Sequence, residues 1–146
     1  MDFGLRFHSK DCVGCHACEV ACKQQHELPP GADLLRILEK IPRFEPIYCR
    51  HCARPPCAEA CPTGAIFRED GAVLLEPEKC IGCRACMEAC PFDAMGFDLE
   101  RAVAVKCDMC LRQRVLQGQK PACATVCPSR CIEFGGLKEM FARPWV

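Results

Sequence analysis

The chain has 146 residues, a mass of 16.2 kDa, 17 cysteines and a formal net charge of zero, with a pI near 6.8. This balance of charge offers no basic surface for nucleic acid and no polybasic patch for a membrane. Charged residues interrupt every hydrophobic run before it reaches the roughly 18 apolar residues that span a bilayer, so no direct membrane span is predicted.

Three uses of so many cysteines compete: a disulfide scaffold, zinc sites and iron–sulfur clusters. The first ten residues, MDFGLRFHSK, lack the features of a secretory signal, and the cysteine count is odd. Both observations disfavour disulfides, which form in oxidising compartments. We therefore expect a soluble protein that resides in the cytoplasm.

The cysteines fall into four quartets that repeat along the chain. They read CVGCHACEVAC, CRHCARPPCAEACP, CIGCRACMEACP and CDMCLRQRVLQGQKPACATVCP. The first and third have gaps of two, two and three residues, the spacing of bacterial ferredoxins, and the fourth contains a 12-residue insertion. A zinc site needs only two CxxC pairs or a mixture of Cys and His, so the spacing favours iron–sulfur clusters.

Each quartet predicts a local geometry. The first three cysteines are expected to wrap one face of a cubane, with Gly14 and Gly82 letting backbone amides approach the sulfurs. The fourth is expected to begin a helical turn that points away and to serve the neighbouring cluster. A proline follows it in three quartets, at Pro62, Pro91 and Pro128. Lys23 follows Cys22 in the first quartet, where a different turn is expected.

Short strands are predicted between the quartets. Residues 65–80 contain two apolar runs around Asp70-Gly71, which predicts a hairpin, and residues 94–107 repeat this layout around Leu99 to Arg101. Residues 34–41 are compatible with a strand or a short helix, because periodicity does not distinguish the two. These pieces indicate a ferredoxin-like α+β unit that is used twice.

The quartets, their order, the four-residue gap in the second and the insertion in the fourth resemble the four-cluster electron-transfer subunits of molybdenum and tungsten oxidoreductases. Examples are the iron–sulfur subunits of dimethyl sulfoxide reductase and formate dehydrogenase, with relatives in hydrogenase, carbon monoxide dehydrogenase and tungsten aldehyde oxidoreductase systems. The resemblance covers residues 12–134. It implies one compact α+β polyferredoxin domain over residues 1–146, with two interleaved ferredoxin-like modules. The inner module spans about 45–104, and the outer module spans about 1–44 plus 105–146.

The resemblance also implies four 4Fe-4S clusters, with about 16 irons, and a ligand set for each. The two sets of the inner module are Cys49, Cys52, Cys57 and Cys90, and Cys80, Cys83, Cys86 and Cys61. The two sets of the outer module are Cys12, Cys15, Cys18 and Cys127, and Cys107, Cys110, Cys123 and Cys22. In every set the fourth ligand comes from the partner quartet.

The function implied is that of an electron-transfer subunit, not an enzyme on its own. It would relay electrons between a large catalytic subunit, a molybdenum or tungsten pterin enzyme, and a second redox partner such as a flavin subunit, a ferredoxin or a membrane anchor. The alternative is a freely diffusing polyferredoxin serving enzymes of the hydrogenase or carbon monoxide dehydrogenase type. No nucleotide-binding or hydrolase motif indicates a substrate site.

The remaining residues are predicted to be structural. Cys131 aligns with Ala65 and Ala94 of the other repeats, which favours a small buried side chain over a ligand. His16 and His51 lie in cluster loops and could donate a hydrogen bond to a cluster sulfur, although packed or exposed histidines are commoner there.

Other segments give weaker signals. His8 and His26 have no distinguishing context. The insertion carries Arg112, Arg114 and Lys120 without an acid. It could dock a partner or offset the charge of anionic clusters, but a solvated loop is the favoured prediction. The stretch LPPGADLL and the C-terminal FARPWV, with Trp145, are possible contact segments.

Overall fold

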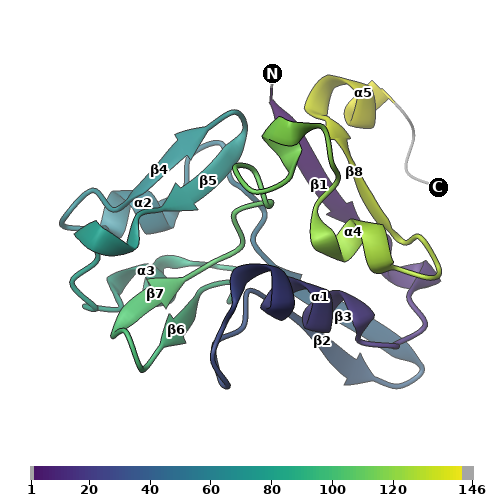
Figure 1. Ribbon diagram of the computed structural model, residues 1–146, viewed down its shortest axis with the longest axis horizontal. Helices are drawn as coiled ribbons and strands as arrows, with labels where there is room; N and C mark the ends of the chain where they lie inside the picture. Colours follow the sequence, from purple (N-terminus) through teal and green to yellow (C-terminus); the bar gives the residue numbers. More distant parts are fainter. Residues whose placement is uncertain (1, 143–146) are drawn as a thin grey trace.

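The computed structural model describes residues 2–142 as a set of two-stranded antiparallel sheets joined by short helices (Figure 1). The strands pair as β1 with β8, β2 with β3, β4 with β5, and β6 with β7. Their bounds are β1 Phe3–Phe7, β2 Leu35–Lys40, β3 Arg43–Tyr48, β4 Ile66–Glu69, β5 Ala72–Leu75, β6 Gly96–Asp98, β7 Val103–Val105 and β8 Ile132–Gly136. This mixture of small helices and strands agrees with the ferredoxin-like α+β class.

The helices are short, and most of them end where a cysteine precedes a proline. The α-helices are α1 Ala17–His26, α2 Pro56–Ala60, α3 Ala85–Ala89, α4 Ala122–Val126 and α5 Leu137–Ala142, and the 3-10 turns are η1 Ser9–Asp11, η2 Pro77–Lys79 and η3 Val115–Gln117. No helix within residues 2–142 is long and apolar enough to cross a membrane.

The elements form two groups in Figure 1, which we call the central half and the terminal half. The central half, residues 49–105, contains α2, α3 and the strands β4 to β7. The terminal half, residues 3–48 and 106–142, brings the two ends of the chain together, because β1 pairs with β8 from Phe3↔Gly136 to Phe7↔Ile132. The β2–β3 hairpin lies in the terminal half, so this grouping keeps together a hairpin that spans the predicted module boundary near residue 45.

Both predicted hairpins are present in the central half. The β4–β5 pair closes through Asp70 and Gly71, which both have positive φ, as a two-residue hairpin turn requires. In the β6–β7 loop, the buried Asp98 carboxylate accepts hydrogen bonds from the amides of Glu100 and Arg101, at 3.0 and 3.2 Å. The ambiguous segment 34–41 forms a strand, β2, because its alternating side chains pack against β3 and the terminal core.

Cysteines supply much of the core. In the terminal half, Cys18 and Cys123 pack with Phe7, Tyr48 and Ile132. In the central half, Cys57 and Cys86 pack with a buried apolar group made of Ile66, Val73, Met95 and Ala104. Aliphatic side chains alone fill neither core, so the thiols and whatever they bind are part of the packing.

The insertion in the fourth quartet joins the two halves. Leu111 and Val115 are buried against Ala72 and Leu74 of β5, and Phe3 of β1 packs at the edge of the same group. The prediction of a solvated loop is therefore wrong for the apolar side chains of this segment, because they pack against the β4–β5 hairpin of the central half. Its Arg112 remains on the surface, beside Glu69.

Candidate iron–sulfur centres

The helices place the third and fourth cysteines of each quartet. The third is buried inside a helix every time, at Cys18, Cys57, Cys86 and Cys123. The fourth was expected to begin a helical turn, and this prediction is wrong: α2, α3 and α4 end one residue before it, and Cys61, Cys90 and Cys127 follow them in an extended conformation. Each of these cysteines precedes a proline, which disfavours the helical conformation in the residue before it.

The first quartet departs from this rule, at the place where the sequence predicts a different local turn. Lys23 stands where the other quartets have proline, and α1 continues past Cys22 to His26. The extra turn carries His26 four residues beyond Cys22, and therefore on the same side of the helix. This is the only quartet in which the fourth cysteine lies within a helix.

A left-handed residue shapes every cysteine loop. The residue two positions after the first cysteine has positive φ in all four, being Gly14, Gly82, His51 or Met109. In the two loops without glycine, the amides of His51 and Met109 donate to the sulfurs of Cys49 and Cys107, at 3.4 and 3.3 Å. The loops thus turn backbone N–H groups toward sulfur, as the tuning of a cluster requires.

The two glycines also make space for neighbouring groups. A Cβ on Gly14 would lie 2.3 Å from the Phe44 ring, and one on Gly82 would lie 2.6 Å from the Ala102 carbonyl oxygen. Their role is thus close packing as well as the left-handed turn.

Helix packing brings the quartets together in pairs. Helix α2 packs against α3, and α1 packs against α4. The second quartet therefore faces the third, and the first faces the fourth, although the chain ends supply the latter pair from opposite termini.

In the central half, cysteines from different quartets share surroundings. A pocket is lined by Cys61 of the second quartet with Cys80, Cys83 and Cys86 of the third. Burial, followed by the nearby thiolates of Cys49 and Cys90, raises the pKa of Cys52. The structure thus brings each fourth cysteine of this half beside the other quartet.

The terminal half shows a similar mixing. Burial raises the pKa of Cys123 far above its usual range, and Cys22 and Cys110 add to the effect. Burial also raises the pKa of Cys18 to about 12, with a smaller contribution from Cys12. The Sγ atoms of Cys127 and Cys131 lie 3.6 Å apart, and Cys131 in turn lies near Cys12.

The spread of the thiols suits a cluster better than a single metal ion. Sulfurs that share one zinc at about 2.3 Å lie about 3.8 Å from one another in a tetrahedron. Across residues 2–142, three or more ligating atoms lie mutually within 4.8 Å at one place only, formed by His26, Asp108 and Cys110. No cysteine triplet is that tight, and all 17 cysteines are unpaired, so the donor set fits multi-iron cubanes.

A buried histidine adds to this fit. His51 is buried, and its Nδ1 accepts a hydrogen bond from the Val73 amide at 2.9 Å. The imidazole proton therefore resides on Nε2, which is buried without a partner among the described residues. Burial, helped by nearby Lys106, holds the pKa of His51 well below 6.5. A cluster sulfide would satisfy this orphaned donor.

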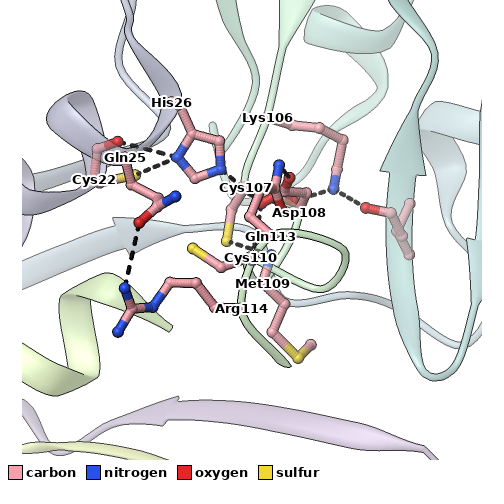
Figure 2. Close-up of polar contacts among 11 residues, drawn as sticks. Cys22, Gln25, His26, Lys106, Cys107, Asp108, Met109, Cys110, Gln113 and Arg114 are labelled. Atoms are coloured by element: carbon pink, nitrogen blue, oxygen red, sulfur yellow. Dashed lines mark hydrogen bonds and ion pairs between the residues drawn. The ribbon is translucent and has the colours of Figure 1, made fainter. Parts of the chain in front are cut away.

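An ion pair that the sequence did not indicate joins the first and fourth quartets (Figure 2). His26 Nε2 lies 2.8 Å from Asp108 Oδ1, and His26 Nδ1 lies 3.0 Å from the Cys22 carbonyl. Asp108 also accepts from the Cys110 amide and from Gln113. Burial is the largest single influence on His26 and lowers its pKa, but the bonds to Asp108, Cys110 and Cys22 together outweigh it and raise that pKa. Burial also raises the pKa of Asp108, but its bonds to His26, Gln113 and the Cys110 amide hold that pKa down at about 2.

The other predicted residues have definite environments. Cys131 is buried like Ala65 and Ala94, which confirms the small buried side chain, whereas its exclusion as a ligand stays a prediction. His16 is held by Glu19 and Glu39. His8 lies 2.9 Å from Glu133, which also pairs with Arg6. Trp145 lies outside the described residues.

Comparison with known proteins now identifies the family. Residues 42–137 match a 4Fe-4S dicluster domain, and residues 9–25 match a 4Fe-4S binding domain. The chain is 38% identical to the thiosulfate reductase electron transfer subunit PhsB of Salmonella typhi, over 94% of this chain and 77% of that protein. It is 38% identical to the B subunit of the anaerobic dimethyl sulfoxide reductase of Haemophilus influenzae, over 94% and 76%. Protein NrfC of Escherichia coli is 34% identical, over 94% and 66%.

The chain belongs to the iron–sulfur electron-transfer subunits of molybdenum oxidoreductases. Its cofactors are 4Fe-4S clusters, and it is a subunit of a reductase complex rather than an enzyme on its own. This confirms the resemblance drawn from the cysteine quartets, and it excludes the zinc and disulfide interpretations.

Proposed function

We propose that this electron-transfer subunit holds four 4Fe-4S clusters in one line and relays electrons between a molybdenum or tungsten pterin subunit and a second redox partner. The four ligand sets are those that the resemblance implies, with the fourth ligand exchanged between paired quartets. The clusters supply one-electron chemistry, and the chain holds, spaces and tunes them.

The neighbours of the thiols support a linear order. Cys86 of the third quartet lies near Cys57 of the second, Cys107 of the fourth lies near Cys49 of the second, and Cys123 of the fourth lies near Cys18 of the first. In this order the clusters run from the third quartet to the second, then to the fourth and finally to the first. The end clusters are those of the first and third quartets.

The exposure of one cysteine in each end quartet is the observation that most supports the relay. Cys15 and Cys83 are the only exposed cysteines in the described chain, and they belong to the first and third quartets. Beside them, Val13 and Ile81 are 61% and 66% exposed at equivalent loop positions. A cluster near the surface with apolar surroundings is suited to electron exchange with a docked partner.

The middle loops are different at the same position. There the residue after the first cysteine is Arg50 or Asp108, and both make contacts within the protein. An exposed cysteine in each end quartet and none in the two middle quartets favour a relay with two partners over a carrier with one docking face.

The partners follow from the family. The relatives are named as subunits of thiosulfate and dimethyl sulfoxide reductases, so a large molybdenum or tungsten catalytic subunit is proposed at one end. A flavin subunit, a ferredoxin or a membrane anchor is proposed at the other. Residence in the cytoplasm is part of this proposal, and fractionation of host cells tests it.

Anaerobic purification of the tagged chain from its host tests the proposal. We expect about 16 irons per chain, together with a stoichiometric large subunit that contains molybdenum or tungsten. About eight irons would contradict the four-cluster relay. A loaded chain that elutes alone would instead support the freely diffusing polyferredoxin.

A further inference from the structure

The peptide of one buried strand residue is held on both sides by side chains next to cluster ligands. Val73 of β5 is fully buried; its amide donates to His51 Nδ1, and its carbonyl accepts from Lys106 Nζ. His51 lies between Cys49 and Cys52 of the second quartet, and Lys106 directly precedes Cys107 of the fourth. We call these three residues the Val73 bridge. It spans the two quartets whose clusters are proposed to lie in the middle of the relay.

Lys106 brings a buried positive charge to this place. Its side chain runs between β5 and the Cys107 loop, and Nζ donates to the carbonyls of Val73 and Cys107 (Figure 2). The residue is only 5% exposed. Within residues 2–142, no carboxylate forms an ion pair with this ammonium. A buried charge without a counter-charge is very unfavourable, so something else must offset it.

The surrounding thiols indicate what that counter-charge is. Lys106 directly precedes Cys107 of the fourth quartet and donates to its carbonyl. It also donates to Val73, which lies in the same buried cluster as Cys57 of the second quartet. The ammonium therefore lies beside proposed ligands of both quartets. An oxidised cubane with four thiolates carries about −2, and reduction adds one more negative charge. The ammonium is thus well placed to offset the charge of two clusters at once.

His51 acts on one side of the same bridge. Because Nδ1 accepts from Val73, the Nε2–H group of His51, a residue between Cys49 and Cys52 in sequence, is a buried donor without a partner among the described residues. Hydrogen bonds to cluster sulfur stabilise the reduced state, because reduction increases the negative charge on the sulfurs. His51 therefore favours reduction of the second-quartet cluster alone, whereas Lys106 favours reduction of both middle clusters.

We propose that the Val73 bridge raises the reduction potentials of the two middle clusters, with Lys106 acting on both and His51 on the cluster of the second quartet. Both are positioning residues: neither is a ligand, and each acts through charge or a hydrogen bond. The proposal rests on the four-cluster relay. As a consequence, electrons pass between the two halves through two clusters whose reduction potentials are raised together by one shared cation, Lys106.

A redox titration of the full cluster-loaded chain, followed by electron paramagnetic resonance, tests the proposal. Variants Cys15→Ser and Cys83→Ser first mark the two end clusters, because each shifts one midpoint. Lys106→Met is then expected to move the two unmarked midpoints to more negative potential and leave the marked ones in place. Lys106→Arg, which keeps the charge, is expected to stay close to the wild type.

Two variants of His51 test its part of the proposal separately. His51→Leu removes both ring nitrogens and is expected to lower one unmarked midpoint. His51→Gln keeps an acceptor for Val73 and a donor for sulfur, so a smaller shift is expected. A role limited to packing would instead lower the iron content of both variants without moving any midpoint.

Several results would overturn the inference. Equal shifts of all four midpoints, no shift in Lys106→Met, or equal shifts in the Met and Arg variants would each exclude a local charge effect. If Lys106→Met does not load clusters, Lys106→Gln, which retains a donor for the two carbonyls, takes its place in the same titration. A wild-type chain with fewer than four midpoints would instead contradict the relay itself.

Discussion

In the central half, the paired strands are neighbours in sequence: β4 follows directly into β5, and β6 into β7. In the terminal half, β1 pairs with β8 across the whole length of the chain. The same cysteine pattern is therefore built in two ways. Turns close the central half, whereas contacts between distant segments close the terminal half.

Some of the polar contacts show the same contrast. In the central half, Asp98 binds amides two and three residues away. In the terminal half, Arg6 pairs with Glu133 and His26 pairs with Asp108, and the partners are 127 and 82 positions apart in the sequence. Loop closure over such distances costs more conformational entropy. We therefore expect the terminal half to depend more on single side chains.

The largest expected effect comes from replacing a fourth cysteine, which is proposed to bind the cluster of the partner quartet, in one half or the other. Cys22→Ser should damage the cluster of the fourth quartet and remove up to about four irons, while the central clusters remain. Cys61→Ser is the matched variant and should damage the cluster of the third quartet instead. Iron analysis with paramagnetic resonance checks both. Loss of the first-quartet signal in Cys22→Ser would refute the exchange of ligands.

The next effect compares the half-buried Asp108 with the buried Asp98. Asp108→Ala leaves His26, the Cys110 amide and Gln113 without their acceptor, and we expect a loss of about 2–4 kcal/mol, or about 5–10 °C in the midpoint of cluster loss. Asp98→Ala frees only two nearby loop amides and should cost about 1–2 kcal/mol. Thermal melts followed by visible absorbance check the difference.

Hydrogen exchange sharpens the same comparison. Asp108→Ala should speed exchange in α1 and in the loop after Cys107, which are distant in sequence. Asp98→Ala should speed exchange only between β6 and β7. Equal and local effects in both variants would show that the terminal half does not depend on the ion pair.

Sequence reasoning succeeded where a residue acts on its own neighbourhood. The Asp70-Gly71 hairpin follows from two residues that tolerate positive φ, and a different turn after Cys22 follows from Lys23 in place of proline. The burial of Cys131 follows from its alignment with two alanines. Each of these features depends on local backbone preference or on direct repetition.

Sequence reasoning failed where a residue acts over distance. His26 and Asp108 are 82 positions apart, and neither carries a motif, so their pairing depends on the folded chain. Burial of the insertion against β5 is a tertiary contact of the same kind. The end of the helix before the fourth cysteine could have been predicted from the sequence, because the proline that follows the cysteine disfavours a helical conformation there.

A smaller effect tests the equivalent glycines of the two halves. Gly82→Ala places a Cβ 2.6 Å from a backbone oxygen, which cannot move easily, and should cost about 2–3 kcal/mol with the strain of positive φ. Gly14→Ala meets the Phe44 ring, which can shift, so a lower cost is expected. Gly64→Ala has positive φ but open space and is the control, at about 1 kcal/mol. Melting midpoints in the opposite order would show that the contacts around Gly82 yield more easily.

The smallest effect is expected at Cys131. Its repeats in the central half have alanine at the same position, and Ala65 and Ala94 are buried there as Cys131 is in the terminal half. Cys131→Ala removes one buried sulfur and should cost about 1 kcal/mol or less, with the full iron content retained. Because its Sγ lies 3.6 Å from that of Cys127, a ligand role is the only alternative with a large signature. Loss of about four irons in Cys131→Ala would establish that role, and would mean that the two halves differ in ligation as well as in closure.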